Sequence, residues 1–432
     1  KIIKTAALSA SLVALASTAF ASDLSLNLFG SSAQANFWNQ NAVTFLTTAA
    51  GSGGEGCQSA VSGFSDPGTN KHGIVIGTNC AGNGGGRVII RYTSNKSVEG
   101  LYAAAGLNPN GVDAATCNND PTMRLQAYDV NSDGTTFSSK CQKVDVAVSD
   151  VASESFTQSS NGNYNGWLTV NPVQHLNLAT ANPPIPGQNY FGTASQPIIV
   201  PFSFYANSNA GISKLNRQQA LLLFSGDVAT WDMFGQGFPQ KNVVVCMRHA
   251  GSGTLATLDK AIMRGDRPLY TSQLTGGAPT VWFMQGTPDM LNCINSNGGD
   301  TTGKSAAIGY ADSDAMTTGY NSDGSENLNT SYPNVQRLLY NGGGQGMTAA
   351  NYTNYKYSAV KNEIINGSYE FWSAQEMYLN PNDAQNTTVA NLFNQAVSFA
   401  GNPQACPGLG CYWAAASEIQ VTKESDSAVP HF

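Results

Sequence analysis

The sequence predicts an α/β fold in which short strands alternate with amphipathic helices. Three observations support this class: apolar β-like runs recur along the chain, stretches with helical periodicity separate them, and several helices begin directly after a strand at Gly, Ser or Thr. Hydrophobic residues make up 41% of the 432 residues, which is enough for a packed core and excludes a wholly disordered chain. At about 150 residues per domain, the length allows two or three domains.

The first part of the chain contains three expected strands and two expected helices. The strand segments are rich in Val, Ile, Leu and Tyr, and they lie at 25–29, 85–94 and 144–150. The helical segments repeat apolar residues at three- and four-residue spacing, at 32–46 and from Ser97 onward. The third strand ends on an acidic residue, Asp150.

The second part continues the same alternation. We expect strands at 197–207, 242–248 and 305–312, and helices at 215–226 and 251–263. The segment 360–378 mixes helical and turn signals and predicts no single element.

The charge composition argues against nucleic-acid binding, and the hydropathy argues against a membrane span. Charged residues make up only 11% of the chain, compared with about 25% in typical soluble domains. Lys and Arg total 21 and Asp and Glu total 28, which gives a net charge of −7 without any basic run, so we expect no binding to nucleic acid. No apolar stretch after residue 22 approaches the roughly 20 residues that a membrane span needs.

Residues 1–21 have the pattern of a secretory signal peptide. Lys1 and Lys4 precede a weakly apolar run, and residues 19–21 form an A-x-A cleavage site. We expect cleavage after Ala21 and a mature chain in the periplasm or outside the cell.

The eight cysteines predict disulfides, because an even number in an exported chain is typical of a disulfide framework. Their spacing favours pairs of neighbours, which are Cys57–Cys80, Cys117–Cys141, Cys246–Cys293 and Cys406–Cys411. The cysteines and the four histidines form no zinc or c-type haem motif, so we expect no metal and no cofactor. Two segments rich in Gly, Ser and Asn, 48–84 and 104–143, would each be closed by one of these disulfides, as stapled surface insertions.

The most informative segment for function is 243–263. A strand delivers Arg248, a Gly-Ser-Gly turn follows, and Thr254 begins a helix. The first turn of a helix presents free N–H groups and the positive end of the dipole, and an arginine can clamp an oxyanion with two hydrogen bonds. The alternative interpretation of this segment is an ordinary helix cap preceded by a flexible turn. The segment predicts an anion site that includes Ser252 and Gly253.

Two further junctions have the same form. The segments GSSA at 30–33 and YTSNKSVEG at 92–100 each lead from a strand into a helix with serine near the cap. Asp150 would repel an anion unless the ligand carries a proton to donate, as hydrogen phosphate does and sulfate does not. Together these residues predict a site for a protonated tetrahedral oxyanion.

In order along the chain, these segments resemble those of the periplasmic phosphate-binding proteins that serve ABC transporters. The matching segments are LFGSSAQANFW, YTSNKSVEG, VDVAVSD, ISKLNRQQALLLFSGDVATW, MRHAGSGTLATLDKAIM, AIGYAD and VKNEIINGSYEFWSAQEMYLN. The resemblance covers most of the mature chain outside the two insertions. It implies a two-lobed type II periplasmic-binding-protein fold with a ligand cleft between the lobes, lobe I at 22–197 and 308–432 and lobe II at 198–307.

The resemblance also implies a set of site residues. The phosphate ligands of the family fall on the hydroxyl of Ser32, the backbone N–H of Ala33, and Ser97, Asp150, Arg248, Ser252, Gly253 and Thr254. The implied function is capture of inorganic phosphate, without catalysis, for an ABC-transporter permease. The chain departs from the family at Ala250, where the family commonly has an aspartate that pairs with the arginine, and His249 is a new neighbour of that arginine.

Two other functions remain open at this stage. A secreted phosphatase or other hydrolase could use His249, Ser252 and Asp150, although the G-x-S-x-G motif is absent. A secreted or surface-displayed protein with a structural role, including self-association, would fit the low charge and the stapled insertions.

Overall fold

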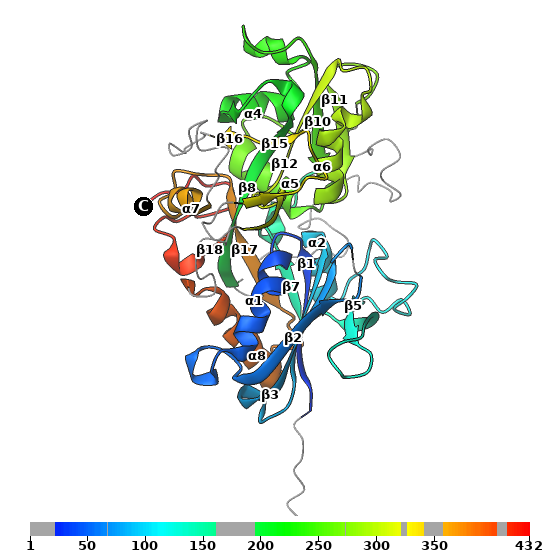
Figure 1. Ribbon diagram of the computed structural model, residues 1–432, viewed down its shortest axis with the longest axis vertical. Helices are drawn as coiled ribbons and strands as arrows, with labels where there is room; N and C mark the ends of the chain where they lie inside the picture. Colours follow the sequence, from blue (N-terminus) through cyan, green and yellow to red (C-terminus); the bar gives the residue numbers. More distant parts are fainter. Residues whose placement is uncertain are drawn as a thin grey trace, which may run out of the picture.

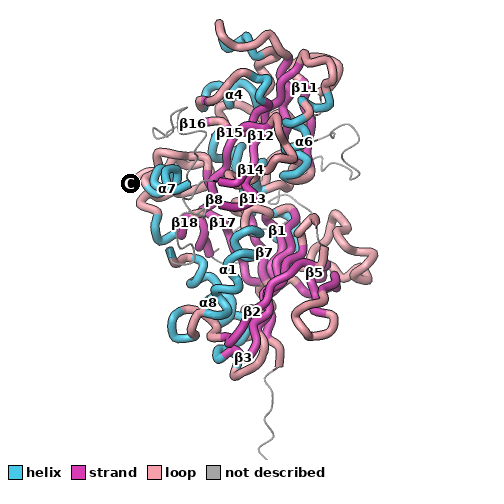
Figure 2. Tube along the Cα trace, in the orientation of Figure 1, coloured by secondary structure: helices cyan, strands magenta, loops and turns pink. Residues whose placement is uncertain are grey.

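The computed structural model describes residues 22–66, 68–160, 195–272, 274–320, 326–340, 357–403 and 413–432. The expected signal peptide and the expected Cys406–Cys411 pair lie outside the described residues. Twelve of the described strands form one large sheet that runs through two α/β lobes, with helices beside it (Figures 1 and 2). This arrangement confirms the α/β class and the two lobes predicted from the sequence. Within the described residues, no helix is both long and apolar enough to span a membrane.

The sheet of lobe I is built around three neighbouring parallel strands. β1 (Leu24–Ser31) lies between β4 (Val88–Asn95) and β7 (Val146–Ser149) and pairs in parallel with both. β3 (His72–Cys80) and β2 (Cys57–Phe64) continue the sheet beyond β4 as antiparallel strands. The carboxyl ends of β1, β4 and β7 therefore meet at one edge of the sheet.

Lobe II also contains a central strand that lies between two parallel neighbours. β10 (Asn242–Arg248) pairs in parallel with β11 (Thr280–Met284) on one side and with β12 (Ser305–Asp312) on the other. The short β15 (Val335–Arg337) joins this part of the sheet by pairing with β8.

One long strand connects the two lobes. The first half of β8 (Ser195–Asn207) pairs with β17 (Trp372–Leu379) and the short β18 (Ala414–Ala415) in lobe I, and its second half pairs with β12 and β15 in lobe II. β8 and β17 run side by side at the waist of the molecule (Figure 1). The boundaries expected at 197/198 and 307/308 fall inside β8 and β12, and we propose to divide the chain at 201/202, where β8 changes partners.

Helices cover the sheet in both lobes. Those beside lobe I are α1 (Ala35–Thr47), α2 (Ser97–Ala104) and α8 (Thr387–Ala400), with α7 (Tyr357–Ile365) near the waist. Those of lobe II are α4 (Arg217–Phe224), α5 (Gly253–Thr257), which continues as a π-type turn to Met263, and α6 (Thr287–Asn295). The remaining strands are the hairpins β5 (Met123–Asp129) with β6 (Phe137–Lys143) and β13 (Thr317–Tyr320) with β14 (Glu326–Leu328), and the pair β9 (Lys214–Leu215) with β16 (Leu339–Tyr340).

Aromatic residues fill the core where β8 enters lobe II. The ring of Phe204 stacks on those of Phe224 and Phe371, with centroids 5.6 and 4.9 Å apart, and all three side chains are buried. Phe371 directly precedes β17, so this cluster joins the connecting strands to lobe II. Packed aromatic cores of this kind fix the position of the strands that they contact.

Three of the predicted disulfides are confirmed, and two of them close the predicted insertions at 48–84 and 104–143. Cys57 pairs with Cys80, Cys117 with Cys141, and Cys246 with Cys293. The first insertion, 48–84, is more than a surface loop, because its strands β2 and β3 extend the sheet of lobe I. The second forms the β5–β6 hairpin, whose Ala127 and Phe137 pack against isoleucines of β3 and β4.

The third disulfide stabilises lobe II by joining β10 to α6. Cys246 and Cys293 are both fully buried and lie 47 residues apart in sequence. Replacing both with Ala should lower the free energy of unfolding by about 2–4 kcal/mol, mainly because the unfolded chain regains the entropy of the closed loop. Urea unfolding of this variant and of the unsubstituted protein would measure the loss of free energy. A Cys117/Cys141 double-alanine variant allows a comparison with the loss of another disulfide. A midpoint equal to that of the unsubstituted protein would contradict the prediction.

Candidate anion site between the lobes

The candidate site begins at the carboxyl ends of the parallel strands of lobe I. β1 ends at Ser31, which pairs with Asn95 at the end of β4, and Ser97 opens α2 two residues later. β7 ends at Ser149, so Asp150 follows at the same edge of the sheet. In open α/β sheets this edge is where ligands bind.

Asp150 is the centre of the hydrogen-bond network at this edge. Its side chain is buried, its Oδ1 accepts from the hydroxyl of Ser31, and its Oδ2 accepts from Thr254 Oγ1 at 3.4 Å. Its backbone N–H donates to Ser97 Oγ at 3.3 Å. Burial raises the pKa of Asp150 to about 6, although the hydrogen bond from Ser31 and the positive charge of Arg248 act in the opposite direction.

Lobe II meets this network through the turn after β10. Gly253 begins α5, and a Cβ atom placed on Gly253 would lie 2.5 Å from Asp150 Oδ2 and closer still to Ser97 Oγ. The backbone N–H of Val98 donates to the carbonyl of Gly251 at 3.3 Å. The two lobes are therefore in direct contact here, and only glycine fits at position 253.

Arg248 lies at the end of β10 and is 3% exposed. Its guanidinium donates to the carbonyl of Gln285 at 3.1 Å and to Thr287 Oγ1 at 3.5 Å, and its backbone N–H donates to the hydroxyl of Tyr310. These partners are neutral oxygens. Burial lowers the pKa of Arg248, and negative charges that include Asp312 and Asp150 oppose this. The guanidinium keeps its charge in a desolvated position.

His249 is buried beside Arg248, and its Nδ1 lies 3.2 Å from the hydroxyl of Ser160. The same hydroxyl accepts the backbone N–H of Ala250 at 2.9 Å. Burial, together with the positive charges of Lys96 and Arg248, lowers the pKa of His249 to about 3, so the imidazole is neutral at physiological pH. No sequence motif links Ser160 to this turn, because they are far apart in the chain.

Three buried polar atoms in one five-residue stretch have no hydrogen-bond partner in the part of the chain that the structure describes. They are Arg248 Nε, His249 Nε2 and Ser252 Oγ. Leaving a buried polar group unpaired costs about 1–3 kcal/mol. Arg248 Nε–H and the hydroxyl of Ser252 are donors that the oxygens of an anion could satisfy.

The structure brings several of the predicted site residues into contact. Asp150 contacts Ser97, Gly253 and Thr254 directly. Arg248 ends β10, and Ser252 lies in the turn that follows it. The backbone N–H of Ala33 donates to Ser31 Oγ at 3.1 Å. Among the described residues, no group of three or more His, Cys, Asp or Glu side chains could hold a metal ion.

Two residues beside Asp150 were not predicted from the sequence. Ser31, which is not among the site residues predicted from the sequence, donates to Asp150, because β1 extends to Ser31 and places this side chain at the strand end, and Ser32 stays a predicted phosphate ligand. Two adjacent serines offer no sequence signal that separates them. Gln375 Oε1 lies 3.2 Å from Ser31 Oγ, and sequence reasoning missed it because β17 falls in the segment 360–378 with mixed signals.

No family model matches the chain, and no curated protein matches it either. Solved structures with a similar arrangement include an ABC-type phosphate transport receptor from Vibrio cholerae, with 10% sequence identity, a TM-score of 0.37, and coverage of 88% of this chain and 95% of the receptor. A phosphate-binding protein from Stenotrophomonas maltophilia has 13% identity and a TM-score of 0.41, over 88% of this chain and 84% of that protein. A DING protein has 13% identity and a TM-score of 0.42, over 88% of both chains.

Proposed function

We propose that the chain is an exported solute-binding protein that captures inorganic phosphate between its two lobes. The observation that carries this proposal is the buried Arg248 at the end of β10, together with a Ser252 hydroxyl that has no hydrogen-bond partner among the described residues and that precedes Gly253, which abuts Asp150. A desolvated guanidinium and hydroxyl donors make strong hydrogen bonds to an oxyanion. Isothermal titration calorimetry with phosphate tests the proposal directly.

Asp150 favours phosphate over fully ionised anions. An ionised carboxylate only accepts hydrogen bonds, so it can face an anion only where that anion carries a proton. Phosphate retains a proton near neutral pH and sulfate does not. The buried position of Asp150 strengthens this discrimination, because an unrelieved repulsion between like charges is costly in a desolvated site.

Ligand capture would act on the equilibrium between open and closed lobes. Asp150 and Ser97 come from lobe I, and Arg248, Gly253 and Thr254 come from lobe II, so an anion held by both sets favours the closed arrangement. The export signal expected at 1–21 fits a protein that works outside the cytoplasm. Delivery of phosphate to an ABC-transporter permease is the accompanying role that we propose.

A hydrolase is less well supported by the contacts of this turn. Activation of Ser252 as a nucleophile would need a base within hydrogen-bond reach. Instead, His249 Nδ1 is placed against Ser160, and Ser252 Oγ has no hydrogen-bond partner among the described residues.

Replacing Arg248 with Ala should weaken phosphate binding by about 2 kcal/mol or more, because it removes a buried charged donor from the site. Calorimetry measures the change. Arg87→Ala is the matched control, because Arg87 pairs with Asp129 away from the site and its loss should leave the affinity unchanged. Equal affinities of the Arg248 variant and the unsubstituted protein would exclude this anion site.

The selectivity against sulfate should depend on pH through Asp150. Below a pKa of about 6, the carboxyl group carries its own proton and can donate it to sulfate; above it, the ionised group repels sulfate. Sulfate should therefore bind about tenfold more weakly at about pH 7 than at about pH 5. In Asp150→Asn this pH dependence should disappear. A sulfate affinity that is independent of pH in the unsubstituted protein would contradict the assigned role of Asp150.

Gly253→Ala should hold the lobes apart, since the new methyl group would overlap Asp150 and Ser97. We expect faster hydrogen exchange at the Val98 amide, which bonds across the lobes to Gly251, and phosphate binding weakened about tenfold or more. Gly277→Ala is the control, because a Cβ there meets no atom within 4 Å. Unchanged hydrogen exchange at the Val98 amide in Gly253→Ala would show that the lobes tolerate the methyl group and would contradict the prediction.

A further inference from the structure

The carboxyl ends of three neighbouring strands surround Arg248 in lobe II. β10 ends at Arg248, which pairs with Met284, the last residue of β11, and Gln285 follows directly. On the other side of β10, the parallel strand β12 ends at Asp312. Thr287 begins α6 two residues after Gln285. The fold therefore brings the start of α6 and the end of β12 together beside this arginine.

The hydroxyl of Thr287 joins Arg248 to Asp312. Arg248 Nη1 donates to Thr287 Oγ1 at 3.5 Å, and Thr287 Oγ1 donates to Asp312 Oδ1 at 3.3 Å. The direction of both bonds follows from their chemistry, because a guanidinium only donates and an ionised carboxylate only accepts. The single proton of the hydroxyl is therefore directed to Asp312, which is 7% exposed. This leaves the oxygen of Thr287 to accept from Arg248.

The second terminal nitrogen of Arg248 is also anchored. Its Nη2 donates to the carbonyl of Gln285 at 3.1 Å. Bonds at both terminal nitrogens fix the plane of the guanidinium, which on a long side chain would otherwise sample several rotamers. Both acceptors are neutral oxygens, so neither removes the positive charge by direct contact. The carboxylate of Asp312 acts from one hydroxyl group farther away.

We propose that Thr287 is a positioning residue, which holds the guanidinium of Arg248 in the orientation that binds the anion. This inference rests on the proposed phosphate site and adds to it a residue that acts through Arg248. An arginine that is fixed in advance loses less rotamer freedom when the ligand arrives, so the affinity is higher. Thr287, Arg248 and Asp312 all belong to lobe II, so the arrangement does not depend on the contact between the lobes.

Phosphate calorimetry on variants of the full chain tests the role of the hydroxyl. Thr287→Val keeps the shape of the side chain and removes the hydroxyl, and it should weaken phosphate binding about tenfold. Thr287→Ser retains the hydroxyl and should bring the affinity back to within about threefold of that of the unsubstituted protein. Thr78→Val is the matched control, because Thr78 is also half-buried and its hydroxyl lies 2.8 Å from that of Ser59, in the β2–β3 pair. Its phosphate affinity should not change.

A double variant shows whether Thr287 acts through Arg248. In an Arg248→Ala background the hydroxyl has no guanidinium to hold, so Thr287→Val should cause no further loss of phosphate affinity. A loss as large as in the presence of Arg248 would mean that Thr287 touches the anion itself, and it would overturn the positioning role.

The remaining outcomes separate this inference from the proposed function. An unsubstituted protein that does not bind phosphate would refute the proposed function and this inference with it. Phosphate binding that Thr287→Val leaves unchanged would overturn the positioning role alone, and so would a failure of Thr287→Ser to restore the affinity, which would point to packing as the cause. Urea unfolding checks that each variant is folded, and Thr287→Ala provides the same test if Thr287→Val does not fold.

Discussion

The structure of the site depends on one buried carboxylate at the contact between the lobes. Asp150 accepts hydrogen bonds from Ser31 of lobe I and Thr254 of lobe II, and Gly253 is packed against it. Charged groups are rarely buried without an opposite charge in contact, and the raised pKa of Asp150 reflects that cost. In the proposed complex, the bound anion balances the charge of Arg248, and the proton that the anion carries is donated in a hydrogen bond to Asp150.

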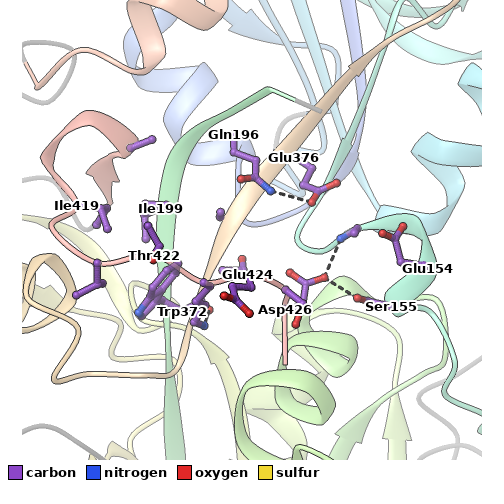
Figure 3. A pocket seen from close by; sticks show the side chains of 17 residues that line it. Glu154, Ser155, Gln196, Ile199, Trp372, Glu376, Ile419, Thr422, Glu424 and Asp426 are labelled. Atoms are coloured by element: carbon purple, nitrogen blue, oxygen red, sulfur yellow. Dashed lines mark hydrogen bonds between the residues drawn. The ribbon is translucent and has the colours of Figure 1, made fainter. Parts of the chain in front are cut away.

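The overall fold could be predicted from the sequence because strand and helix periodicities are strong in its central segments. β10 and β12 have the bounds that the sequence predicts, at 242–248 and 305–312. β17 could not be predicted in the same way. Its residues Trp372–Leu379 mix polar and apolar types, because one face of the strand meets the anion site and the other lines a cavity beside β8 and the C-terminal segment 416–426 (Figure 3). This two-sided environment removes the simple alternation on which strand prediction relies.

The candidate site was predictable to the level of segments rather than atoms. Strand-to-helix junctions identify Ser97 and the turn at 251–254, and the end of a strand identifies Asp150, since parallel strands bring their carboxyl ends together. The choice between Ser31 and Ser32 depends on where β1 ends, and the contact between His249 and Ser160 joins segments about ninety residues apart in sequence. Such contacts are decided by tertiary packing, which local patterns do not encode.

β17 places the anion site and the cavity on opposite faces of one strand. Gln375 points toward Ser31, and its neighbour Glu376 lines the cavity, as expected from the alternation of side chains along a strand. Asp426 bonds to Ala152 and Ser155, which follow Asp150 within a few residues. The wall of this cavity therefore includes the same strand and the same turn that position the buried carboxylate. The low overall charge of the chain is compatible with the anion site, because that site concentrates a few charged side chains among neutral donors and acceptors.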